Sequence, residues 1–189
     1  MDEKDKQIIT MLQADGRTTL QDIAKKIGLT SMGTKKRLDR LQKNGTIKIS
    51  ALINPNALKL YPAIVMLEVE SAEAMQNLLD RFEECPRVVQ IFKTLGGYNL
   101  IALVVAETKE TLESISMEKC SLRCSKGIRR SEFYPVSETY FSPFLQIREN
   151  LAQKKNKTAP CKVECSPCNR YETKKCVGCP TSGNYKGTL

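Results

Sequence analysis

Cysteine is concentrated at one end of this chain. Five of its eight cysteines lie in the last 29 residues, as Cys161-x3-Cys165-x2-Cys168-x7-Cys176-x2-Cys179, and the chain has no histidine. Two C-x2-C pairs at this separation can close on a single tetrahedral ion, with thiolate as the ligand. The segment is too short to bury a hydrophobic core of its own, so a bound metal would supply its folding free energy. The sequence therefore predicts a metal- or cluster-stapled module at this end.

Two kinds of centre fit these five cysteines. Zinc needs four ligands, and two knuckles supply them as Cys165, Cys168, Cys176 and Cys179, which leaves Cys161 over. An iron–sulfur cluster also takes four thiolates, and the first three cysteines of the module with one from the second knuckle could hold it. We expect zinc or an iron–sulfur cluster on these residues, with thiol/disulfide switching without metal as a third reading.

The remaining cysteines lie in the middle of the chain. Cys120 and Cys124 are four residues apart and share a face if a helix extends that far, so they could form a redox or metal pair. Cysteine is more often a small buried apolar residue, and we favour that structural role for both. Cys85, directly before Pro86, is also interpreted as structural.

The composition, with 41% hydrophobic and 27% charged residues, is ordinary for a globular chain of 189 residues. No apolar run approaches the roughly 18 residues that a membrane span needs. The charged start leads directly into a helical pattern and shows no signal peptide. We therefore expect a cytoplasmic protein, in which C-x2-C spacing points to metal or redox chemistry rather than to disulfides.

Charge is distributed unevenly along the chain. Residues 1–60 carry a net +6, residues 61–146 carry −3, and residues 147–189 carry +6. Two basic ends around an acidic middle suit a chain whose ends meet a polyanion and whose middle meets other protein. The alternative is that any chain with a pI near 9 has basic segments.

The first third of the chain predicts three short helices. Residues 4–12 have helical apolar spacing, a capping box beginning at Thr18 opens a second helix that ends at Gly28, and Thr30 caps a third that stops at Asn44-Gly45. Residues 47–53 alternate as a strand, which we interpret as one arm of a wing. This order indicates a winged helix-turn-helix domain over residues 1–53.

The third helix is the expected DNA-reading element, because it would lie in the major groove with its first turns at base edges. We expect base contacts from Ser31, Met32, Thr34 and Lys35. We expect phosphate contacts from Lys36, Arg37, Arg40 and Lys43. A solvated basic face is the alternative, which the complete three-helix pattern disfavours.

The middle of the chain predicts a ferredoxin-like domain over residues 61–146, after a short linker at 54–60. Strands are expected at 61–70, 88–94, 98–106 and 128–136, with helices at 71–84 and 108–117. The order βαββαβ is that of a ferredoxin-like sandwich. Because this fold leaves one face of its sheet uncovered, pairing of two such sheets is an economical solution.

Three stretches of sequence resemble the Lrp/AsnC family of transcription regulators, at residues 15–30, 36–47 and 93–101. The resemblance covers about residues 2–140. It implies a homodimer formed through the ferredoxin-like domains, often assembled further into tetramers or octamers, on double-stranded DNA. It also implies small effectors, usually amino acids, bound between those domains near a Gly-x-Tyr/Phe-Asp turn.

This chain departs from the family at that turn, which reads Gly96-Gly97-Tyr98-Asn99. An aspartate can pair with an amino group, whereas Asn99 can only form hydrogen bonds. These four residues are the candidate effector site, and a plain hairpin turn without a ligand is the alternative.

Together these patterns predict an α+β chain. It combines the winged helix-turn-helix, the ferredoxin-like domain, a basic linker at 147–160 and a Cys-rich module at 161–189. The expected function is sequence-specific transcription regulation, with a metal-bound tail that is structural or senses redox or metal state. No paired-carboxylate, Ser/His or Cys/His arrangement indicates an enzyme. The alternatives are a sirohaem-decarboxylase-like enzyme, which would lean on histidine that the chain lacks, and a ligand- or partner-binding protein that no longer binds DNA.

Overall fold

The structure, a computed structural model, describes residues 1–152, 156 and 158–189. They form two compact units, Met1–Ala51 and Leu52–Leu189. The Cys-rich segment at 161–189, expected as a module of its own, is part of the second unit. Part of the expected linker at 147–160, namely 153–155 and 157, lies outside the described residues.

The first unit contains three helices, α1 (Glu3–Ala14), α2 (Leu20–Ile27) and α3 (Ser31–Lys43). The N-cap of α2 is Thr19, one residue after the expected Thr18, because its side chain accepts from the backbone N–H of Asp22. The helix ends at Gly28 with a φ of 65°, a left-handed conformation that glycine adopts without strain. The helices pack around four buried side chains, namely Ile8, Ile23, Ile27 and Leu41.

The expected wing strand at residues 47–53 is not formed. Residues 47–52 have no regular secondary structure, and Ile53, which belongs to the second unit, makes one isolated antiparallel bridge with Leu145 of the same unit. A strand needs a partner for its backbone groups. The segment therefore alternates apolar and polar side chains but forms no hydrogen-bonded ladder with another strand in the described part of the chain. Ile49 and Leu52 are exposed.

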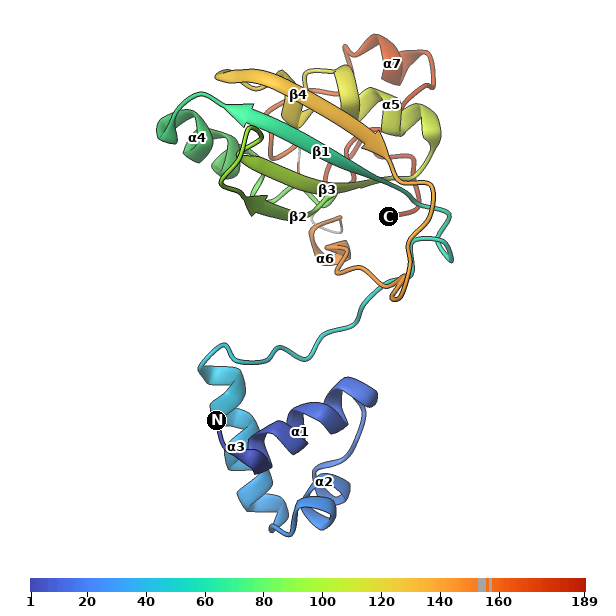
Figure 1. Cartoon of the computed structure of the whole chain (residues 1–189). Helices are drawn as coiled ribbons and strands as arrows, with labels where there is room; N and C mark the ends of the chain where they lie inside the picture. Colours follow the sequence, from blue (N-terminus) through green and yellow to red (C-terminus); the bar gives the residue numbers. More distant parts are fainter. Residues whose placement is uncertain (153–155, 157) are drawn as a thin grey trace. The chain divides into compact units, whose positions relative to one another are not determined.

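The second unit has the expected βαββαβ order. Its elements are β1 (Tyr61–Val69), α4 (Ala72–Phe82), β2 (Val88–Lys93), β3 (Leu100–Ala106), α5 (Lys109–Met117) and β4 (Ile128–Pro135). The strands form one antiparallel sheet in the order β2-β3-β1-β4 (Figure 1). The ferredoxin-like fold is thereby confirmed.

The two faces of the sheet differ in character. Alternate residues of β1, from Ala63 to Val69, are buried in a core with Leu78 and Phe82 of α4. Ile64 of β1, Phe92 of β2 and Tyr134 of β4 are large, exposed and on the opposite face, as the strand registers place them. This opposite face is called the open face below.

The tail includes two one-turn helices, α6 (Glu149–Ala152) and α7 (Asn169–Glu172). Its two ends, Ile147 and Leu189, pack with Leu60 and Val105 in a separate cluster. Ala159 and Cys161 join the same buried cluster as the strands and α4. The tail therefore shares the hydrophobic core of the ferredoxin-like domain. Figure 1 shows the red segment of the chain beside the sheet.

The helix that Cys120 and Cys124 would need in order to share a face does not extend to them, and the buried structural role favoured for both does not fit the exposed Cys124. Helix α5 ends at Met117, and Cys124 lies in a separate 3-10 turn, η1 (Leu122–Cys124). The exposed Cys124 lies with its Sγ 3.2 Å from the carbonyl of Met117, whereas Cys120 packs against the main core. The two thiols therefore occupy different environments.

Candidate functional site

The outward side of α3 carries a mixed polar and basic surface. Thr30 caps its N-terminus by accepting from the backbone N–H of Gly33 at 3.1 Å. The exposed residues of the predicted set are Ser31, Met32, Lys35, Lys36, Arg40 and Lys43, with Met32 76% exposed. These six residues are placed where a nucleic acid could touch them.

Thr34 is a correction to the predicted set. Its side chain is 0% exposed and lies inside the three-helix unit, with its hydroxyl unpaired among the described residues. A residue without accessible surface cannot touch a base edge, so Thr34 belongs to the core of α3.

The two arginines of α3 are engaged within the unit. Arg37 donates to Asp2 at 2.6 Å and to Asp5 at 2.9 Å, and Arg40 donates to Asp5 at 2.8 Å. Asp5 is 1% exposed, whereas the side chain of Arg37 is 27% exposed and that of Arg40 is 54% exposed. Burial opposes ionisation of Asp5, but the hydrogen bond from Arg37 and the charge of Arg40 outweigh it and lower its pKa. The first role of these arginines is thus to fix α3 against α1, and Arg40 alone of the two keeps most of its surface.

The predicted effector turn joins β2 to β3 at one end of the sheet. Asn99 accepts from the backbone N–H of Val69 and donates to its carbonyl, each at 2.8 Å. Only an amide can make both bonds, because aspartate has no donor at neutral pH. Asparagine at this position therefore clamps the end of β1, which is a structural reason for the departure from the family pattern.

Tyr98 of the same turn belongs to a polar cluster on β4. Its hydroxyl and that of Tyr134 both donate to Glu132, and Arg130 stacks over the Tyr98 ring at 4.4 Å. The hydrogen bonds from Tyr134 and Tyr98 lower the pKa of Glu132. A Cβ on Gly97 would come within 3.3 Å of the Arg130 guanidinium, so glycine leaves room for this cluster. Gly96 has no comparable contact.

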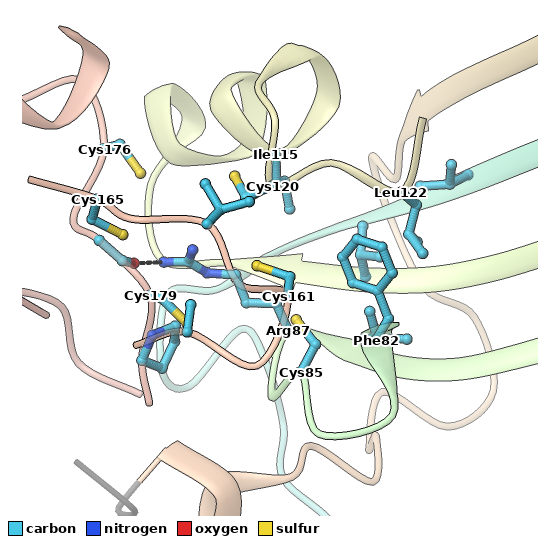
Figure 2. Close-up of a pocket in the computed structure, with 17 residues that line it drawn as sticks. Phe82, Cys85, Arg87, Ile115, Cys120, Leu122, Cys161, Cys165, Cys176 and Cys179 are labelled. Carbon is cyan, nitrogen blue, oxygen red and sulfur yellow. Dashed lines mark hydrogen bonds between the residues drawn. The ribbon is translucent and has the colours of Figure 1, made fainter. Parts of the chain in front are cut away.

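Six cysteines surround one cavity between the tail and the domain core. Two come from the domain and four from the tail: Cys85, Cys120, Cys161, Cys165, Cys176 and Cys179. The cavity encloses about 60 Å³ and is otherwise lined mainly by apolar side chains such as Val65 and Ile115. Figure 2 shows the six thiols arranged around the side chain of Arg87.

Cys168, the remaining predicted ligand, is placed elsewhere. It precedes α7 and lines an adjoining cavity, together with Cys120, Cys165 and Cys176. The structure therefore brings four of the five predicted ligands together and adds two cysteines from the domain that had been interpreted as structural. No three Cys, Asp or Glu side chains in the described part of the chain converge on a single ion as they stand.

Burial is the largest influence on the pKa of Cys85, Cys120, Cys161 and Cys165. It raises the pKa of Cys85 to about 11 and that of Cys120 to about 12. Burial also raises the pKa of Cys165, against an opposing hydrogen bond from the backbone of Cys179. Without a bound cation Cys85 and Cys120 are therefore protonated at neutral pH, and metal binding by them would release protons.

Arg87 was not singled out from the sequence. It lies directly before β2 and forms an ion pair with Glu107 in which both side chains are buried. Its guanidinium also donates to the carbonyl of Gly178, between Cys176 and Cys179, at 2.6 Å. A charged residue between apolar neighbours in a strand-forming stretch was the only sequence signal for a buried arginine. No local pattern predicts that it bonds to the Gly178 carbonyl in the tail.

The tail is attached by further polar contacts. Arg170 donates to Ser114 of α5 at 2.6 Å and forms an ion pair with Glu113, and Ser114 also donates to the carbonyl of Lys175. Gly178 has a φ of 84°, and a Cβ there would come within 2.8 Å of the Asn184 carbonyl, so this knuckle requires glycine. These contacts fix the second knuckle over α5.

Comparison with known proteins matches both units. Residues 1–48 match the family described as winged helix-turn-helix DNA-binding, and residues 62–144 match the Lrp/AsnC ligand binding domain. The transcriptional regulator FL11 of Pyrococcus abyssi is 32% identical over 119 residues, covering 60% of this chain and 76% of the relative. LrpA of Pyrococcus horikoshii is 29% identical over 121 residues, covering 63% of this chain and 85% of that protein.

Solved structures agree with this fold. Escherichia coli AsnC superposes with a TM-score of 0.65 at 19% identity, covering 75% of this chain and 95% of that one. The leucine response regulatory protein LrpA of Mycobacterium tuberculosis superposes with a TM-score of 0.66 at 25% identity, covering 76% and 97%. The cysteines at 161–179 lie beyond both matched family segments.

A helix-turn-helix unit joined to a ligand-binding ferredoxin-like domain defines a DNA-binding transcription regulator. The chain belongs to the Lrp/AsnC family. The relatives are named as transcriptional regulators, which confirms that the chain is not an enzyme and leaves the decarboxylase alternative without support. No helix among the described residues is long and apolar enough to cross a membrane.

Proposed function

We propose that the chain is a sequence-specific regulator that reads double-stranded DNA with α3, as a homodimer, and that its cysteine-rich tail carries a thiolate-bound metal centre. The observation that carries the DNA-reading part is the outward side of α3, where Ser31 and Met32 open the helix and Lys35, Lys36 and Lys43 remain exposed. In helix-turn-helix proteins the first turns of this helix meet base edges and its basic residues meet phosphates.

Within this surface the roles divide by exposure. Ser31, Met32 and Lys35 suit base edges, and Lys36 and Lys43 suit phosphates. Arg40 can reach a phosphate while it remains bonded to Asp5, because half of its side chain is free. Arg37 acts mainly by positioning the helix.

Dimerisation is assigned to the open face of the sheet. Phe92 is 50% exposed there, beside Ile64 and Tyr134, and large apolar side chains at the surface of a sheet favour burial against a second copy. Two-fold symmetry would then present two α3 helices to two DNA half-sites.

An amino-acid effector is the ligand class proposed for this domain. A solved relative, the regulator NMB0573 of Neisseria meningitidis, is a complex with L-Met. Here the candidate residues Gly96, Gly97, Tyr98 and Asn99 are constrained by the Asn99 clamp and the Tyr98–Glu132 contact, so an effector would have to meet Tyr98 and its cluster rather than a free carboxylate.

The tail centre is zinc or an iron–sulfur cluster. The support is that Cys161, Cys165, Cys176 and Cys179 face one cavity. Such a centre either braces the assembly or reports metal or redox state to DNA affinity. The location proposed for the protein is the cytoplasm.

The test of DNA reading is a titration of labelled promoter DNA, measured by fluorescence anisotropy at several salt concentrations. The variant Lys36→Ala plus Lys43→Ala should weaken binding at every sequence and reduce the slope of log K against log [salt] by about 2, one for each phosphate contact. A matched control removes two lysines of the second unit, Lys126→Ala plus Lys162→Ala, and should leave the slope unchanged. Equal losses in both variants would contradict the groove assignment of α3.

A further inference from the structure

We propose that Cys85 and Cys120 of the ligand-binding domain are ligands of the metal centre, so that the centre is shared between the domain core and the tail. The inference rests on the proposed function in one respect, namely that the tail binds a metal centre. The ligand chemistry is thiolate, and its occupant is an iron–sulfur cluster or a zinc ion.

The cavity itself argues for a shared site. The tail places four cysteines at the main cavity, whereas Cys168 lines the adjoining cavity. Cys85 and Cys120 line the same main cavity as these four, and they come from the connection after α4 and the connection after α5. Cys120 also lines the adjoining cavity, so this domain cysteine borders the tail cysteines in both.

The chemistry of the lining suits a soft metal. Thiolates are the preferred ligands of zinc and of iron–sulfur clusters, and apolar walls such as Phe82 and Leu122 limit access of water. The backbone of Cys179 donates a hydrogen bond to Cys165, and that of Val163 donates one to Cys161, as second partners of ligating sulfur usually do. The buried guanidinium of Arg87 places a permanent positive charge beside a centre that four thiolates would make anionic.

The two domain cysteines lie on supported loops. Arg148 donates to the carbonyls of Glu83 and Cys85, each at 2.5 Å, which fixes the turn that carries Cys85. Arg81 donates to the carbonyl of Lys119 at 2.6 Å and to Ser125 at 3.2 Å, on either side of Cys120. Ligands held by a second layer of hydrogen bonds form a site with defined geometry.

The side chains would have to move to hold either occupant. No three Cys, Asp or Glu side chains among the described residues converge on one point as they stand. Binding of zinc or of a cluster would therefore require side-chain rotations toward a common centre.

The experiment uses the full chain, prepared without oxygen, in parallel reconstitutions with ferrous iron plus sulfide and with zinc alone. Zinc, iron and acid-labile sulfide per chain are measured for the wild type, for Cys85→Ser plus Cys120→Ser, and for the tail variant Cys165→Ser plus Cys176→Ser. Cys124→Ser is the matched control, because Cys124 is an exposed domain cysteine outside both cavities. Far-ultraviolet circular dichroism checks that each variant is folded.

The proposal expects the domain variant to lose most of its bound metal per chain, as the tail variant does, while Cys124→Ser keeps the wild-type content. If the domain variant keeps the wild-type content and only the tail variant loses it, the shared site is overturned and the metal-bound tail stands. If the wild type binds neither zinc nor a cluster, both are overturned. The iron and zinc arms identify the occupant.

A measurement on the wild-type chain protects the test against a misfolded variant. Cadmium-113 replaces zinc at thiolate sites, and its scalar couplings to cysteine Hβ protons identify the ligating residues directly. Coupling to Cys120 or Cys85 supports the proposal, and coupling confined to tail cysteines overturns it.

Discussion

Arg87 and Glu107 form a buried ion pair, 2.8 Å between Nη2 and Oε2, that joins the beginning of β2 to the residue after β3. The same guanidinium donates to the carbonyl of Gly178, and Glu107 accepts from the hydroxyl of Tyr185. Two residues of the domain thus bind two points of the tail. The tail is held by a desolvated polar network as well as by its apolar contacts.

Breaking this pair should destabilise the second unit strongly. In Arg87→Met the carboxylate of Glu107 remains buried without its cation, which costs about 3–5 kcal/mol. Urea unfolding of the metal-free chain measures this loss. The double variant Arg87→Met plus Glu107→Gln should recover part of it, because the unpaired charge is gone. A loss below about 1 kcal/mol for the single variant would contradict the role of the pair in docking the tail.

Asp5 should control the acid stability of the first unit. Its lowered pKa means that the ionised form is favoured in the fold, so its contribution is present above about pH 4 and is lost as pH falls through the folded pKa. We expect Asp5→Asn to destabilise the helix-turn-helix unit by about 2 kcal/mol at pH 7, and to make its stability less dependent on pH below 4. The exposed Asp39 provides the control Asp39→Asn. Thermal unfolding with unchanged midpoints for Asp5→Asn would contradict the role of Asp5 in holding α3.

The clamp at Asn99 should not tolerate the acid that is common in the family. In Asn99→Asp the donor to the Val69 carbonyl is replaced by a charged acceptor, so we expect a loss of about 1–3 kcal/mol in the free energy of unfolding. Asn54→Asp is a matched control, since the Asn54 side chain accepts from the backbone N–H of Asn56 and donates to no other group in the described part of the chain. Equal stability of the two variants would mean that the amide donor of Asn99 contributes nothing.

The open face should determine the oligomeric state. A charge at its centre, in Ile64→Glu, would be buried without a partner if two sheets pair, so the variant should shift toward monomer. Leu95→Glu changes a fully exposed residue in the β2–β3 connection and serves as the control. Sedimentation velocity over a range of concentrations measures both. An Ile64→Glu variant that sediments like the wild type would place the dimer interface elsewhere.

Elements with strong local signals were predictable from the sequence. The order of helices and strands followed from periodicity. The apolar residues that alternate in β1 and recur at helical spacing in α4 are the ones that the fold buries. The wing strand at 47–53 failed because alternation cannot supply a hydrogen-bonding partner.

Side-chain partners over long distances were not predictable. Arg37 and Arg40 have the sequence of a basic helix face, and only the fold brings them to Asp5, more than thirty residues away. Cys85 and Cys120 have the sequence of isolated core cysteines, and only the docking of the tail places Cys161 beside them. A fifth tail cysteine beyond the four that one ion needs was the available hint of a larger site.

Selection of bound fragments from a random DNA library, using the full chain at physiological salt, tests sequence-specific reading by α3 most directly. A dimer with two α3 helices should enrich a two-fold symmetric sequence with half-sites separated by about one helical turn or a multiple of it. The variant Lys36→Ala plus Lys43→Ala should bind the enriched sequence more weakly without changing it. Absence of any enriched sequence, with retention that does not depend on α3, would contradict the assignment of this protein as a sequence-specific regulator.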